Sequence, residues 1–116
     1  MKIYHGERQS LSGRQRVDVE VIELKGDKVE KSCYELEPKD SQKLYNHSPD
    51  GFNWGYSGSG PAQLALAMLL DLTGNEELSR VNYQQFKACF IANFSDRWFL
   101  TEPEIRTWLE KQEVPA

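Results

Sequence analysis

The segment that most constrains the fold is an apolar run that begins directly after Pro61. Residues 62–72 are apolar except for Gln63 and Asp71, and Gly74 follows the run. Proline suits the first position of a helix, because the N–H that it lacks has no partner there, and glycine commonly caps the other end. A helix that is apolar on every side must be covered by other elements. The sequence therefore predicts a central, buried helix that begins at Pro61.

Alternation of valine with acidic residues predicts a long strand from residue 17 to residue 21. The apolar phase then shifts at Ile22 and Leu24, which predicts either a bulge or a strand end with two apolar faces. A tight turn around Gly26 joins this strand to a second one at 29–36, so the two form a hairpin. Other patterns predict short strands at 2–4 and 98–100 and a polar loop at 7–15.

Two further helices are predicted after the apolar one. Residues 76–94 carry an apolar stripe, interrupted by Asn82 and Asn93, which need hydrogen-bond partners if they are buried. Thr101 and Glu104 are spaced as a capping box, in which each side chain bonds the other residue's backbone N–H. The predicted core face of the first of these helices contains Leu78, Tyr83, Phe86, Cys89, Phe90 and Phe94. That of the second contains Ile105, Trp108 and Leu109.

Residues 37–60 lie between the hairpin and the apolar helix and show no periodic pattern. Long structureless segments are functional loops or conceal an unrecognised element, and both options stay open. The fold expected from the whole pattern is an α+β domain spanning 1–116. It combines a small antiparallel sheet, made of the hairpin and short edge strands, with three helices. Its parts are a β-rich region at 1–36, the loop at 37–60 and a helical region at 61–116.

Composition excludes several classes of function. A formal net charge of -4 and a pI near 5.2 disfavour nucleic acid as a partner. No apolar segment reaches the roughly 20 residues that a bilayer requires, and the first residues lack a signal peptide, so we expect a cytoplasmic protein without membrane contact. We expect Cys33 and Cys89 to be reduced and packed as small hydrophobes, although a bridge between them stays open. The spacing of His and Cys predicts no metal site, and we expect no cofactor.

The glycine-rich entry to the apolar helix has two interpretations. The free first-turn amides, expected at Ala62 and Gln63, could hold a phosphate or carboxylate, with Ser57 or Ser59 adding a hydroxyl donor. Alternatively, the glycines of Gly58–Gly60 only permit a tight turn that packs aromatic residues over the helix, which is the interpretation we favour. Neither a phosphate-loop lysine nor a dinucleotide fingerprint nor a nucleophile elbow is present.

Other residues of the 37–60 segment are weaker candidates. His47 could act as an acid or base beside Ser48 or Asp50, but a histidine in such a turn more often packs. Trp54 and Tyr56 could stack on a planar ligand or pack in the core. If they are exposed, they favour a protein-binding patch instead.

Several stretches resemble a small family of uncharacterised domains found in bacteria, archaea and their phages. They are Asn46–Phe52, Trp54–Tyr56 and Gly58–Ala67, followed by weaker matches at Tyr4–Gly6, Tyr83–Lys87 and Trp98–Leu109. The resemblance covers nearly the whole chain and implies no particular activity. It marks as candidate ligand- or partner-binding residues those that match the motif, namely His47, Ser48, Trp54, Tyr56, Ser59, Gly60 and Gln63.

Three functional hypotheses follow. The first is a non-enzymatic accessory protein that binds a protein partner, as a phage or mobile-element product that modulates a host or defence system. The second is a module that binds a small anionic ligand at Gly58–Gln63. The third, an enzyme using His47 with Ser48 or Ser59, ranks last. A monomer and a small homo-oligomer are equally compatible with the sequence.

Overall fold

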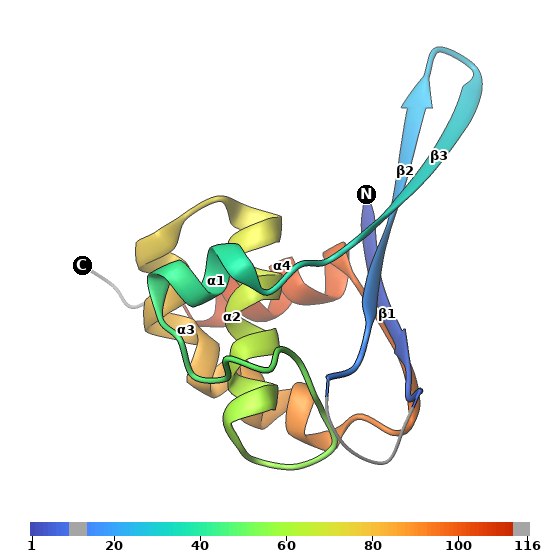
Figure 1. Ribbon diagram of the computed structural model, residues 1–116. Coiled ribbons are helices and arrows are strands. Elements are labelled where there is room, and N and C mark those ends of the chain that lie inside the picture. The colour runs from blue at the N-terminus through green and yellow to red at the C-terminus, as the bar shows by residue number, and fades with distance from the viewer. Residues whose placement is uncertain (10–13, 113–116) are drawn as a thin grey trace.

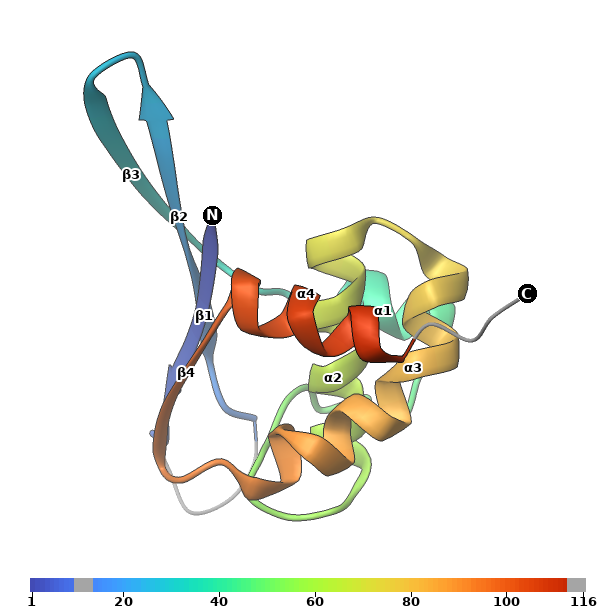
Figure 2. The ribbon, with the colours of Figure 1, turned by 180° about the vertical axis from the view of Figure 1, so that it is seen from behind.

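The structure is a computed structural model that describes residues 1–9 and 14–112. Its sheet has four antiparallel strands in the order β3-β2-β1-β4, and helices cover one face of it (Figures 1 and 2). The predicted α+β class is confirmed. The strands are β1 (Lys2–Glu7), β2 (Val17–Lys25), β3 (Lys28–Glu35) and β4 (Arg97–Thr101), and the helices are α1 (Lys39–Leu44), α2 (Ser59–Thr73), α3 (Glu76–Cys89), the 3₁₀ helix η1 (Ile91–Asn93) and α4 (Glu102–Lys111).

Strand β1 is longer and more central than the sequence predicts. It pairs with β2 on one side and β4 on the other, so it is not an edge strand. Gly6, predicted to lie near a polar loop, pairs with Val17 and Trp98 inside the sheet. Residues 10–13 of the predicted 7–15 loop lie outside the described residues.

Helix α2 forms the centre of the core and begins earlier than predicted. Its residues from Gly60 to Leu69 are all buried, as an all-round apolar helix requires. The helix starts at Ser59, and the Ala62 amide already donates to the Gly58 carbonyl at 3.0 Å. Pro61 therefore lies within the first turn, where its missing N–H costs nothing, instead of at the first position. Gly74 caps the C-terminus with a φ of 64°, as predicted.

The β2–β3 hairpin extends beyond the rest of the molecule (Figure 1). The β2–β3 register runs from Asp18↔Glu35 to Lys25↔Lys28 without a shift, so the predicted bulge is wrong. Strand β1 pairs with β2 only as far as Val21. Ile22 still exchanges backbone hydrogen bonds with Met1, and beyond it β2 and β3 pair only with each other; we call residues 22–31 the arm.

The structure differs from the prediction at three further points. The segment 37–60, named as a loop in the expected fold, contains helix α1, so of the two options left open it conceals an unrecognised element. Helix α3 ends at Cys89 and is followed by η1. Cys33 and Cys89 are free but exposed, so their predicted packing as small hydrophobes is wrong. The capping box of Thr101 and Glu104 is confirmed.

Candidate binding surfaces

Gln63 acts as a structural clamp between α2 and the segment before it. Its Oε1 atom accepts hydrogen bonds from the amides of His47 at 2.7 Å and Ser48 at 3.0 Å. Its Nε2 atom donates to Ser41 Oγ at 2.9 Å and to the Tyr45 carbonyl at 3.1 Å. A primary amide has two donors and two acceptor positions, so this fully buried side chain has none left for a ligand.

His47 packs between two tyrosines. Its ring stacks on Tyr45 with centroids 4.3 Å apart, and its Nε2 lies 2.5 Å from the hydroxyl of Tyr83. Burial, followed by the charge of Lys87, lowers the pKa of His47. Among the described residues, the ring nitrogen contacts Tyr83 and not a serine hydroxyl, so the acid–base arrangement of the enzyme hypothesis is not assembled.

The glycines at the entry to α2 allow side chains to approach the backbone closely. A Cβ atom at Gly58 would lie 2.6 Å from the ring of Tyr56. A Cβ atom at Gly60 would lie 2.8 Å from the Cβ atom of Asn53. Both distances are shorter than real contacts, so glycine at these positions serves the packing of the 53–56 turn against α2.

Trp54 belongs to the core and is unavailable for stacking on a ligand. It is fully buried, meets Trp98 edge-on at 5.5 Å between ring centroids, and has the guanidinium of Arg8 5.2 Å from its own centroid. Arg8 also donates to the Asn53 side chain and the Trp54 carbonyl. The aromatic loop is thus tied to β1, the strand that Arg8 follows.

A small pocket does lie at the N-terminus of α2. Its volume is about 210 Å³, and the described residues that line it include Ser48, Tyr56, Ser59 and Gly60 from the predicted set, with Arg14 bringing a positive charge. Because α2 begins at Ser59, its first-turn amides without a helical acceptor are those of Ser59 and Gly60, not Ala62 and Gln63 as predicted. Arg14 is itself paired with Glu35 at 3.6 Å.

A larger cavity, of about 630 Å³, lies where the arm joins the body. We call it the arm-root groove. It runs between the end of β3, helix α1 and the C-terminal half of α2. Its apolar floor is formed by Leu36, Leu44, Ala67 and Leu70. Its charged rim is formed by Glu35, Glu37, Lys39, Asp40, Lys43, Asp71 and Glu76. This groove is not predictable from the sequence pattern, because residues 39–44 show no periodic signal for α1.

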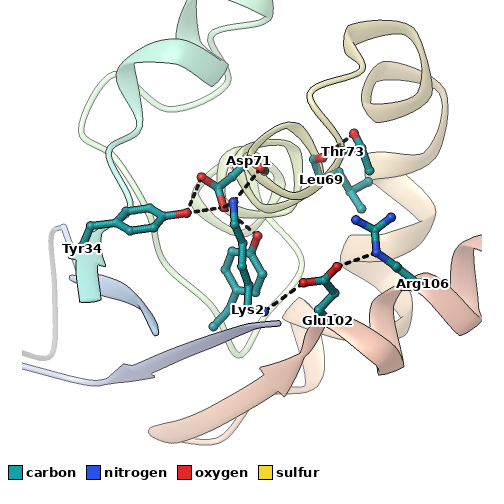
Figure 3. A network of polar contacts seen from close by, with 8 residues as sticks. Lys2, Tyr34, Leu69, Asp71, Thr73, Glu102 and Arg106 are labelled. Atoms are coloured by element: carbon teal, nitrogen blue, oxygen red, sulfur yellow. Dashed lines mark hydrogen bonds and ion pairs between the residues drawn. The ribbon is translucent and has the colours of Figure 1, made fainter. Parts of the chain in front are cut away.

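Asp71 fixes one end of the arm-root groove (Figure 3). Its carboxylate accepts hydrogen bonds from Tyr4 at 2.7 Å and Tyr34 at 2.8 Å, and it pairs with the Lys2 ammonium at 3.1 Å. Burial, followed by the Asp71 carboxylate, raises the pKa of Tyr4, so its hydroxyl keeps the proton that it donates. These contacts join β1, β3 and α2 at one point.

The sheet face opposite the helices carries exposed apolar residues. Tyr4, Val19 and Leu100 are buried under the helices, and alternation turns their neighbours toward the other side, which we call the open face. The side chain of Phe99 is 69% exposed there, and the cross-strand pair of Leu24 and Val29 on the arm is 77% and 58% exposed. The shift in apolar phase at Ile22 and Leu24 thus places Leu24 and its cross-strand partner Val29 on the open face.

Neither a metal centre nor a membrane span is found in the described part of the chain. No group of three or more His, Cys, Asp or Glu residues there could hold a metal ion, and no helix there is long and apolar enough to cross a bilayer.

The fold and its surfaces define a small α+β domain with a projecting hairpin and a groove at the root of that hairpin. The chain belongs to a family of unknown function, DUF6166, whose model matches residues 4–111. The prediction of an uncharacterised domain is confirmed at this level. No curated protein and no solved structure matches the chain.

Proposed function

We propose that this protein is a non-enzymatic accessory protein that binds a protein partner through the arm and the open face. The observation that carries the proposal is the apolar pair of Leu24 and Val29, exposed on a two-stranded arm that projects from the body (Figure 1). A two-stranded hairpin without support is only marginally stable in water, and covering its apolar side chains would stabilise it.

The surroundings of the apolar pair also favour a protein interface. Glu20 and Lys31 lie on the same face of the hairpin as this pair, whereas Lys25 and Glu30 form an ion pair of 3.1 Å on the opposite face. An apolar centre with a polar rim is the usual organisation of a protein–protein interface. The resemblance to phage-borne domains supports a host or defence-system protein as the partner.

Matched variants test this proposal. The double variant Leu24→Thr/Val29→Thr removes the apolar pair but keeps residues that favour strands. Val81→Thr is the control, because Val81 is similarly exposed, on helix α3. Each tagged protein is incubated with lysate of the host, and captured proteins are quantified by mass spectrometry. We expect a protein that the wild type and Val81→Thr retain and the double variant loses. Equal capture by all three proteins, or no specific capture, would contradict the proposal.

A second candidate function is binding of a small anion at the N-terminus of α2. The specific observation in its favour is the pocket in which Arg14 lines the same space as Ser48, Ser59 and Tyr56. Thermal unfolding with phosphates, nucleotides and small carboxylates tests it. A ligand at about 100 times its dissociation constant adds roughly 2.7 kcal/mol of stability. An upward shift in melting temperature that Arg14→Gln abolishes supports this function, whereas unchanged melting curves contradict it.

A further inference from the structure

We propose that the arm-root groove binds a short cationic segment with aliphatic side chains, contributed by the protein partner. This inference deepens the proposed function and rests on it, because it names a second contact region and the chemistry of the partner. The groove does not include Leu24 or Val29, so the two contact regions can be tested separately.

The floor of the groove is suited to aliphatic side chains. Leu36 and Ala67 are buried in the protein, while Leu44 and Leu70 remain half-exposed within the cavity. The cavity volume of about 630 Å³ lies in the size range of ligand-binding pockets. An inserted leucine or valine would remove the exposed parts of Leu44 and Leu70 from water, which is favourable in proportion to the apolar area covered.

The rim of the groove selects for positive charge. Five carboxylates line it against two lysines. Lys2 pairs with Asp71, and Arg14 and Arg16 pair with Glu35. The remaining three carboxylates, those of Glu37, Asp40 and Glu76, accept no hydrogen bond and form no ion pair within residues 1–9 and 14–112.

Unpaired carboxylates around an apolar floor concentrate negative potential, which attracts cations. Lysine or arginine side chains on either side of an apolar anchor would therefore meet a carboxylate that has no partner in the free protein. The two rim lysines, Lys39 and Lys43, both lie on α1, whereas Glu37 precedes α1 and Glu76 begins α3.

The walls of the groove are held in place before any partner binds. Ser41, in the middle of α1, is fixed by its hydrogen bonds with the Pro38 carbonyl and the Gln63 side chain. The opposite wall is fixed by the hydrogen bond between Tyr34 and Asp71 (Figure 3). A preformed site loses less conformational freedom on binding, so a short segment can bind measurably.

Three labelled peptides of seven residues provide the probe. The first alternates leucine with lysine and arginine; the second has glutamate in place of the cations; the third has serine in place of the leucines. Binding to the full chain is followed by fluorescence anisotropy at low and high salt. We expect the first peptide to bind, the second not to bind, and the third to bind more weakly. Binding of the first peptide should weaken with salt, as expected for exposed charges.

Variants locate the site. Asp40→Lys and Glu76→Lys each reverse one unpaired rim charge, and each should weaken binding of the first peptide by about fivefold, the upper range for an exposed ion pair. Leu44→Ser should weaken it through the floor. Glu110→Lys makes the same change in net charge on the exposed surface of α4 and should leave binding unchanged. Circular dichroism and thermal unfolding confirm that each variant is folded.

Several outcomes would overturn the inference. The first is that the first peptide does not bind. The second is that Glu110→Lys weakens its binding as much as the rim variants do. The third is that the first and second peptides bind equally well. Light scattering tests whether a second copy of the chain fills the groove instead. A dimer that dissociates when the first peptide is added would mean that it does. Leu24→Thr/Val29→Thr should bind the first peptide normally, so failure of the groove and failure of the arm are distinguishable.

Discussion

The hydroxyl of Tyr34 lies 2.8 Å from both carboxylate oxygens of Asp71, and this contact joins the root of the arm to the buried helix α2. Tyr34 comes from β3, the outermost strand on its side of the sheet. Lys2 and Tyr4 bind the same carboxylate from β1. One side chain of α2 and its three donors therefore hold the root of the arm against the body, in addition to the pairing of β2 with β1.

Tyr34→Phe should loosen the arm root without unfolding the protein. The substitution removes one hydrogen bond to a charged acceptor, which is worth about 1.5 kcal/mol of unfolding free energy when partly exposed. Urea denaturation measures this loss, and hydrogen exchange should show reduced protection at residues 32–36. Tyr45→Phe is the control, because the Tyr45 side chain is exposed and should tolerate loss of its hydroxyl. Equal effects of the two substitutions would show that the Tyr34–Asp71 contact is not stabilising.

Gln63→Leu should destabilise the protein by about 3 kcal/mol, because buried donors left without partners carry their full desolvation cost. The amides of His47 and Ser48 would lose their acceptor. Urea denaturation measures the difference, and the exposed Gln84→Leu on α3 is the control. A loss below that of the control would rule out the role of Gln63 as a clamp.

Gly60→Ala should cost about 1–3 kcal/mol of unfolding free energy through overpacking. Its Cβ atom would meet the Cβ of Asn53 at 2.8 Å and the Asn53 backbone nitrogen at 3.2 Å. Ser59→Ala, at the adjacent exposed position, should be nearly neutral. The melting temperatures of the two variants give the comparison. A neutral Gly60→Ala would show that the 53–56 turn can move away from α2.

Stability should fall as the pH is lowered below the ordinary pKa of histidine, in part because of His47. Burial, followed by Lys87, depresses the pKa of His47 in the folded state below 6.5. The unfolded chain therefore takes up the proton first, and stability present above pH 6.5 is lost as the pH falls toward the folded pKa. Urea midpoints between about pH 8 and pH 5 should decline more steeply for the wild type than for His47→Gln. Parallel curves would contradict this assignment.

Elements with strong local signals were predicted well from the sequence. The alternating valines of β2, the turn at Gly26, the left-handed cap at Gly74 and the capping box at Thr101 each depend on residues close together in the chain. Such signals need no knowledge of the remaining fold. The antiparallel sheet and the buried α2 followed from them.

Helix α1 escaped prediction because it lacks such a signal. It has six residues, and Ser41 is its buried one. A polar residue at that position gives no apolar stripe, and the buried Ser41 hydroxyl finds its partners in the Pro38 carbonyl and the distant Gln63 side chain. The arm-root groove depends on α1, so it could not be predicted either.

The predicted site residues show a related limit. Gln63 and Trp54 match a distinctive motif, yet both are buried and used for structure. A sequence motif identifies residues that are constrained, and the constraint can come from packing as well as from a ligand. Val29 lies outside the matching stretches and Phe99 only in a weaker one, and the exposure of both depends on which strand pairs with which.

The separation between arm and body has a consequence for how the protein can change. Apart from the hydrogen bonds between Ile22 and Met1, residues 22–31 pair only within the hairpin, while the core is built from β1, the first half of β2, β4 and the helices. New side chains on the arm would leave the folding of the body largely untouched. Under the function proposed above, a change of partner would therefore require new side chains at only ten surface residues, without a search for another stable fold.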